Sequence, residues 1–116
     1  METETQLSVP DELELLEFFG AEPIVRSLED GYWCYEATDS RGVRMRFSFN
    51  IFDRSVQTEL SVAGAPVATV SHEGATRLRR EGSTLCCDFL GEDWKGSLTV
   101  VVGALLHAEW SMLRTT

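Results

Sequence analysis

Apolar and polar residues alternate with a period of two along much of the chain after residue 32. The clearest stretch covers residues 43–51, where an apolar set alternates with a polar set: Val43, Met45, Phe47, Phe49 and Ile51 against Arg44, Arg46, Ser48 and Asn50. Successive side chains on a strand point to opposite faces of its sheet. The pattern therefore predicts a strand with the apolar set buried and Arg44, Arg46 and Ser48 facing outward.

The segment before this strand predicts its hairpin partner. Residues 33–38 alternate in the same way, and Ser40-Arg41-Gly42 is typical of a three-residue loop with glycine in the left-handed conformation. This loop places Glu36 opposite Arg46 and Asp39 opposite Val43. The register keeps the apolar residues of both strands on one face, so the loop and the alternation agree.

Further strands are predicted over residues 56–62 and 67–72, in a hairpin around Glu81-Gly82 that pairs Leu78 with Leu85, and over 97–102. Residues 104–114 have the composition of a helix and the alternation of a strand. We favour a strand, because a valine-rich strand and Gly103 precede it.

A short helix is predicted to begin near Ser8, with Ser8 as the N-cap, Pro10 in the first turn and Asp11 at the capping-box position. Its apolar side consists of Leu15, Leu16, Phe18 and Phe19. Gly20 is suited to end the helix and Pro23 prevents its continuation.

Together these elements predict an α+β fold: a short N-terminal helix followed by a curled antiparallel β-meander of about seven or eight strands. The 116 residues are expected to form a single domain, 1–116, with residues 1–7 frayed.

Composition and cysteine content indicate a globular protein of the cytoplasm. Hydrophobic residues make up 43% of the chain and charged residues 25%, and the longest apolar run is far shorter than the roughly 20 residues that span a bilayer. The first ten residues lack the basic and apolar regions of a signal peptide. Cys34, Cys86 and Cys87 form an odd set, which predicts reduced thiols.

The negative charge is concentrated at the start of the chain. Residues 1–30 hold nine acids and one base, a net of −8, whereas residues 31–116 hold ten acids and nine bases, a net of −1. This distribution disfavours nucleic acid and anionic membranes and favours a basic protein partner. The candidate partner-binding residues are Asp11, Glu14, Glu17, Glu22 and Trp94.

Each of these candidates also has a simpler interpretation. Acids in the first turns stabilise a helix dipole and keep a protein soluble. Trp94, in the loop 90–96, is suited to anchor in the core as well as to contact a partner. The arginines of residues 77–80 are interpreted as a solvated hairpin that offsets the acidic helix.

No sequence motif predicts catalysis, a metal site or a cofactor. The chain lacks a G-x-S-x-G elbow, a C-x-x-C pair and a phosphate-binding loop. The two histidines, His72 and His107, leave open a Cys–His or Ser–His pair formed in three dimensions, and His107 with Glu109 is the best local pair of metal ligands. We predict no catalytic residue, no metal site and no cofactor.

Both ends of the chain resemble small cytoplasmic immunity proteins of bacterial polymorphic-toxin systems. The opening L-x-F-F-G-x-x-P corresponds to residues 16–23, and the ending E-W-S-x-L corresponds to residues 109–113. The resemblance implies a non-enzymatic protein that binds a toxin domain, often a basic nuclease, and blocks its active site. It transfers no catalytic residue.

The leading hypothesis is an immunity-like inhibitor, a monomer or weak homodimer, that docks an acidic surface on a basic toxin. One alternative is a small-ligand-binding or enzymatic domain with a pocket in the curled sheet near His72 and His107. Another is a structural or assembly subunit that uses an exposed strand edge. A deep pocket that holds a histidine would favour the first alternative.

Overall fold

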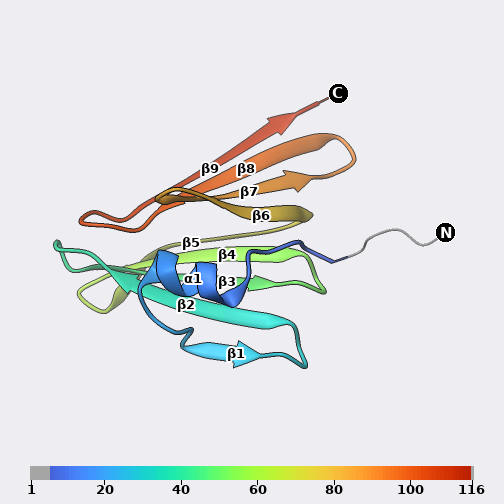
Figure 1. Ribbon diagram of the computed structural model, residues 1–116. Coiled ribbons are helices and arrows are strands. Elements are labelled where there is room, and N and C mark those ends of the chain that lie inside the picture. Colours follow the sequence, from blue (N-terminus) through green and yellow to red (C-terminus); the bar gives the residue numbers. More distant parts are fainter. Residues whose placement is uncertain (1–5, 116) are drawn as a thin grey trace.

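The computed structural model describes residues 6–115, in which one helix, α1 (Glu12–Phe19), precedes nine strands (Figure 1). The first sheet has the order β1-β2-β3-β4-β5 and consists of β1 (Val25–Ser27), β2 (Tyr32–Thr38), β3 (Val43–Asn50), β4 (Ser55–Val62) and β5 (Ala65–Glu73). The second has the order β6-β7-β8-β9 and consists of β6 (Ala75–Glu81), β7 (Thr84–Leu90), β8 (Trp94–Val101) and β9 (His107–Arg114).

The predicted combination of an N-terminal helix and sequential antiparallel strands is confirmed, but a single curled meander is wrong. The chain divides into two sheets at Gly74, the one residue between β5 and β6. Gly74 has φ +88°, and a Cβ atom there would lie 2.9 Å from the carbonyl oxygen of Leu90. A residue with a side chain would be strained in this conformation, so glycine permits the sharp corner. The three-residue β1 is too short to show an alternation and was not predicted.

The β2–β3 hairpin has the predicted register. Glu36 lies opposite Arg46, and the Asp39 N–H donates to the Val43 carbonyl at 2.9 Å. The central apolar residues of β3 are buried, while Val43 and Ile51, at its two ends, are only half-buried.

The predicted exposure of Ser48 is wrong. Ser48 faces away from the core, as the alternation requires, yet it is 7% exposed. It lies in the central part of the sheet between Cys34 of β2 and Gln57 of β4, and its short side chain does not reach past its neighbours. Arg44, on the same face, is half-buried.

The helix begins later than predicted. Asp11 is the N-cap, and its Oδ1 accepts a hydrogen bond from the Glu14 N–H at 2.8 Å. Ser8 is extended and lies beside β6, where its carbonyl accepts from the Leu78 N–H at 2.8 Å. The N–H and carbonyl of Ser8 are thus bonded to β6, and this extended pairing is incompatible with a helix that begins at Ser8. Gly20 ends the helix in the left-handed conformation, as predicted.

The predicted fraying of residues 1–7 does not extend to Leu7. Its side chain is 3% exposed, and its N–H donates to the Ile51 carbonyl at 2.9 Å. Residues 1–5 lie outside the described residues.

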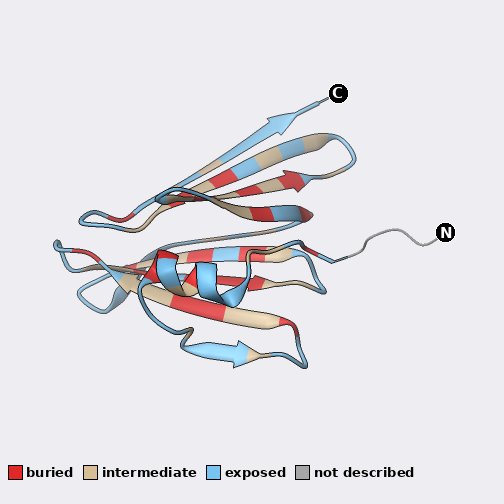
Figure 2. Ribbon diagram, in the orientation of Figure 1, coloured by how far each residue is buried: buried red, intermediate tan, exposed pale blue. Residues whose placement is uncertain are grey.

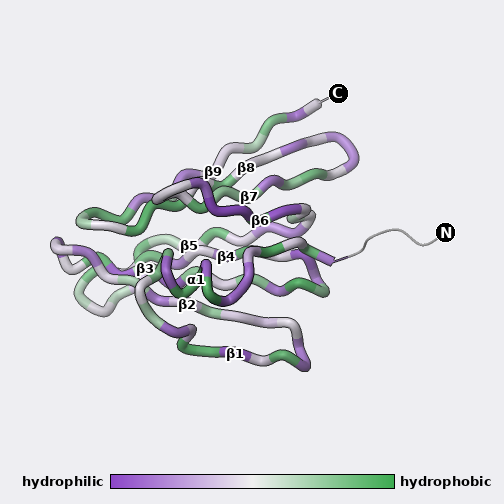
Figure 3. The backbone as a smooth tube through the Cα atoms, viewed as in Figure 1, coloured by the Kyte–Doolittle hydropathy of each residue, from purple (hydrophilic) through white to green (hydrophobic). Residues whose placement is uncertain are grey.

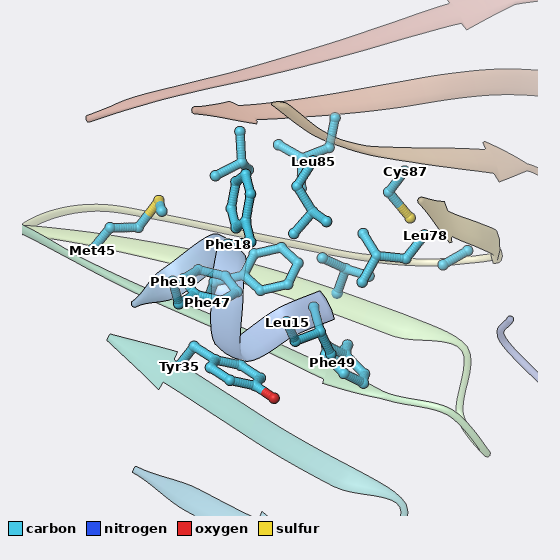
Figure 4. Close-up of a cluster of buried hydrophobic side chains, with 14 of the residues drawn as sticks. Leu15, Phe18, Phe19, Tyr35, Met45, Phe47, Phe49, Leu78, Leu85 and Cys87 are labelled. Atoms are coloured by element: carbon cyan, nitrogen blue, oxygen red, sulfur yellow. The ribbon is translucent and has the colours of Figure 1, made fainter. Parts of the chain in front are cut away.

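The apolar side of α1 packs between the two sheets (Figure 4). The Phe19 ring stacks on Tyr35 with centroids 4.5 Å apart and contacts Phe47 at 5.7 Å. Buried segments of the two sheets and the helix face one another (Figure 2). The core is therefore built jointly by α1 and the inner faces of both sheets.

The C-terminal segment is a strand, β9, as favoured from its alternation, and it pairs with β8 without a register shift. The β6–β7 hairpin differs from its predicted register. Leu78 pairs with Cys87, and Leu85 pairs with Arg80, because the two turn residues are Gly82 and Ser83. All three cysteines are free thiols, as predicted.

Replacing Phe47, which is fully buried, tests the core. We expect Phe47→Ala to lower the free energy of unfolding by about 3–5 kcal/mol, because the lost ring leaves a cavity between helix and sheets. Urea unfolding measures this change. Phe52→Ala is the matched control, since Phe52 is 49% exposed, and should cost less than about 1 kcal/mol. A loss below about 1 kcal/mol for Phe47→Ala would show that the ring is not part of the core.

Candidate functional site

The acidic residues in and beside α1 fall into two groups, and those of the first, Glu12 and Glu17, pair with basic residues of the chain. Glu12 accepts hydrogen bonds from Arg26 Nε at 2.8 Å and from Trp33 Nε1 at 2.9 Å. The hydrogen bonds from Arg26 and then Trp33 lower the pKa of this carboxyl. Glu12 therefore joins the helix to β1 and β2.

Glu17 also has a partner within the chain. Its Oε1 lies 3.1 Å from Arg80 Nη1, and the Arg80 guanidinium lies 6.0 Å from the centre of the Phe18 ring. Figure 3 shows hydrophilic stretches of α1 and β6 in the same region of the molecule. The predicted offset of the acidic helix by the 77–80 arginines is realised at this ion pair, which is exposed and worth at most about 1 kcal/mol.

The acids of the second group are exposed to solvent. Glu14 and Glu22 are exposed, and within residues 6–115 neither forms an ion pair. Asp11 is exposed as well, although one of its oxygens caps the helix. Asp11, Glu14, Glu17 and Glu22 together are called the acidic surface below.

Trp94 lies at the start of β8, in the second sheet. Its ring centroid is 5.6 Å from that of His72, and the indole packs close to Gly74 and Gly91. Trp94 is half-buried against the core. These contacts do not bring it together with the acidic surface on α1.

The two histidines do not share a site. His72 is half-buried, not at the surface, and its ring lies 5.6–6.1 Å from the rings of Phe89, Trp94 and Trp110. His107 is exposed on β9 with its Nε2 3.5 Å from Glu109 Oε1. His107 and Trp110 are three positions apart along the strand, so their side chains point to opposite faces.

A depression of about 270 Å³ lies on the outer side of the first sheet near His72. Its lining is mostly polar and includes His72 itself, with Tyr32, Ser48, Gln57 and Ser71 among the nine residues. Across the described part of the chain, no three metal-ligating side chains lie close enough to hold an ion.

The thiols are not activated. Burial raises the pKa of Cys87 to about 12 and also raises the pKa of Cys34 and of Cys86. A thiol acts as a nucleophile in its deprotonated form, and these shifts keep all three protonated near neutral pH. The arrangement therefore does not supply the activated Cys–His pair that the sequence left open.

The sequence analysis missed a buried carboxylate at Asp39, whose side chain is fully enclosed. Asp39 accepts hydrogen bonds from the side chain and N–H of Arg41, from the Val43 N–H at 3.1 Å and from the Leu106 N–H at 2.9 Å. The Arg41 guanidinium first, and then the Leu106 N–H, hold its pKa well below the usual range. An aspartate before a turn predicts hydrogen bonds to nearby backbone groups, but the local sequence does not predict the hydrogen bond from the distant Leu106 N–H.

These hydrogen bonds fasten the β2–β3 hairpin to the segment before β9. Ser40 adds two more, since its N–H and Oγ both donate to the Ala104 carbonyl at 3.2 and 3.1 Å. The hairpin of the first sheet thus fixes the position at which β9 of the second sheet begins.

The fold of this chain is similar to that of one chain in a solved protein complex. No family model and no curated protein match it. Among solved structures, it is similar to a chain of the contact-dependent growth inhibition toxin–immunity protein complex from Klebsiella pneumoniae 342. The TM-score is 0.82 at 18% identity, over 91% of this chain and 96% of that chain.

This likeness establishes a common fold over almost the whole of both chains. The resemblance to immunity proteins noted at the two ends of the sequence is thereby confirmed at the level of the fold. Within residues 6–115, no helix has the length and apolar character needed to cross a membrane.

Asp39 predicts a pH dependence of stability. Its pKa in the folded protein lies below the ordinary value of 3.8, so its stabilisation is complete above that value and is lost as the pH falls through the folded pKa. Asp39→Asn should unfold at lower urea concentration at pH 7, and its stability should decline less steeply between pH 4 and lower pH. Urea midpoints across this range measure both effects.

Asp53→Asn is the matched control, because Asp53 is an exposed turn aspartate that forms no ion pair in the described structure. It should follow the wild-type pH dependence. Equal acid sensitivity of Asp39→Asn and the wild type would contradict a structural role for the Asp39 carboxylate.

Proposed function

We propose that this chain is a non-enzymatic immunity protein that binds a toxin domain and neutralises it in the cytoplasm. The observation that carries the proposal is the likeness in fold to a chain of a toxin–immunity protein complex, over 91% of this chain and 96% of that one. The unactivated thiols and the separated histidines support a role for surfaces and not for catalysis.

The proposed toxin domain is basic. The chain carries a net charge of −9, and Glu14 and Glu22 expose carboxylates without an ion pair in the described structure. Such a field speeds association with a positively charged partner and favours its correct orientation. The acidic surface is therefore proposed as the region that guides the toxin, and Trp94 as a separate contact on the second sheet.

Neutralisation by binding has a simple physical requirement. The immunity protein must cover the active site of the toxin, or the surface through which the toxin reaches its substrate, and must dissociate slowly. Acidic groups that resemble a nuclease's phosphate-rich substrate in charge would serve this purpose against a basic nuclease.

Co-expression tests the proposed function directly. The probe is the protein encoded by the gene next to that of this chain, which the proposal expects to contain the toxin domain. Its expression alone should stop bacterial growth, and co-expression of this chain should restore growth. Isothermal titration calorimetry with a catalytically inactivated toxin domain should show a saturable complex. Absence of both protection and binding at micromolar concentrations would refute the proposal.

The acidic surface makes a kinetic prediction. Glu14→Gln/Glu17→Gln/Glu22→Gln should slow association with the toxin domain at low salt and flatten its salt dependence, because steering by charge is screened by ions. The free energy of unfolding should change by no more than about 1 kcal/mol, since the variant breaks only the exposed Glu17–Arg80 ion pair. Stopped-flow measurements at two ionic strengths provide the rates.

A charge-matched control separates the acidic surface from net charge. Glu29→Gln/Glu73→Gln/Glu92→Gln removes the same three charges from exposed positions outside α1. It should slow association less than the helix variant. Equal rates for the helix variant and the wild type at low salt would show that the acidic surface does not guide the toxin.

A further inference from the structure

The two sheets have four edge strands, β1, β5, β6 and β9, and the first three are each short, interrupted or partly covered. β1 has only three residues, β5 contains Pro66 beside a register shift, and β6 is flanked by the extended backbone at Ser8. Short strands, prolines, bulges and covering segments are the usual means of preventing an edge from pairing with another chain. The fourth edge strand is β9.

β9 is long, regular and uncovered. Its eight residues pair with β8 without a bulge, and it contains no proline. In Figure 1 it forms the outer margin of the second sheet, and most of its residues are exposed (Figure 2). Its eight residues therefore present a continuous free edge for pairing.

The hydrogen-bonding pattern shows which groups point outward. The Thr115 N–H donates to the Asp93 carbonyl, and the Gly91 N–H donates to the Trp94 carbonyl. Because bonded and unbonded residues alternate in an antiparallel pair, the odd-numbered residues of β9 bond to β8. The N–H and C=O groups that point to the free edge belong to Ala108, Trp110, Met112 and Arg114.

At the N-terminal end of this edge, the outward main-chain groups already form hydrogen bonds with the β2–β3 hairpin. The Leu106 N–H donates to Asp39 Oδ2 at 2.9 Å, and its carbonyl accepts from Arg41 Nη2 at 3.2 Å. Leu106 continues the same even-numbered series. The β2–β3 hairpin therefore closes the N-terminal end of the edge and leaves the part from Ala108 to Arg114 open.

Depressions lie on both faces of the sheet beside the open part. One, of about 360 Å³, is lined by Asp93, Trp94, Met112, Leu113 and Arg114. The other, of about 210 Å³, is lined by Lys95, Gly96, Ser97, Ser111 and Leu113. The side chains of an added strand would point alternately to the two faces, so each depression is placed to receive one set.

We propose that an extended basic segment of the toxin pairs with β9 and becomes the fifth strand of the second sheet. This inference rests on the proposed function and names the contact by which the toxin is held. The main-chain groups of β9 supply affinity, and the two depressions, with the exposed Leu113, supply selectivity.

The charge of the chain selects this occupant over a second copy. Pairing two β9 edges would bring together two molecules of net charge −9, which repel each other. A basic segment is attracted by the same net charge, which lies mainly in residues 1–30 and therefore acts on the approach of the segment and not locally at β9. The acidic surface thus brings the basic toxin to the chain, and the main-chain groups of β9 hold its extended segment.

Amide hydrogen exchange of the complex with the inactivated toxin domain tests the pairing. The amides of Ala108, Trp110 and Met112 should exchange at least tenfold more slowly in the complex than in the free protein. The amides of Ser111 and Leu113, which already bond to β8, are the internal control and should change little. Unchanged exchange at the outward amides in a formed complex would overturn the proposal.

Proline at an outward position gives a second test. Met112→Pro removes an N–H that points to the free edge and leaves the β8–β9 hydrogen bonds in place. It should raise the Kd for the toxin domain at least tenfold relative to Met112→Ala, which controls for loss of the side chain. Equal Kd values for the two variants would contradict strand addition. If Met112→Pro does not fold, the exchange measurement decides.

The outcomes distinguish this inference from the proposed function. Toxin binding without protection of β9 overturns strand addition and retains the immunity function. No binding and no growth protection overturn both. A concentration-dependent dimer, with β9 amides protected in the absence of toxin, would assign the edge to a second copy and also overturn the proposal.

Discussion

The two-sheet architecture depends on the backbone conformation of Gly74. Without a left-handed residue between β5 and β6, the two strands would continue as one and the later hairpins would extend the first sheet. The corner is held from both sides, because the Gly74 carbonyl accepts from Leu90 and the next N–H, of Ala75, donates to the Arg54 carbonyl. The turn therefore directs the second sheet back over the first, where α1 supplies Leu15, Phe18 and Phe19 to fill the space between them.

Because the second sheet packs over the first, polar side chains can form hydrogen bonds between the two sheets. Trp110 Nε1 donates to Thr58 Oγ1 at 2.9 Å across the two sheets, and Asp39 accepts from the Leu106 N–H just before the start of β9. Both contacts are formed by groups that would be costly to bury alone. They position β9 against the first sheet through its inner side and its beginning, which leaves its outer edge open.

The surface divides the demands of protein binding between two kinds of interaction. Net negative charge acts over about 8–10 Å at ordinary salt and sets how fast a basic partner arrives. Main-chain groups at an open strand edge act only in contact and set how the partner is held. Part of the helix's charge is compensated within the chain, since Glu12 is bonded to Arg26 and Trp33, and Glu17 to Arg80.

Local patterns in the sequence determined the elements of this protein, and contacts between distant segments determined the site. Alternation identified β3, its hairpin register with β2 and the strand character of β9, because burial of one face selects every second residue. It did not reveal that Ser8 pairs with β6 or that Gly74 splits the meander. Asp39 and Leu106 are 67 residues apart, and a hydrogen bond over that separation leaves no periodic trace in the sequence. The open edge of β9 was likewise decided by the tertiary structure, because the order of the strands in the two sheets determines which strand lies at an edge.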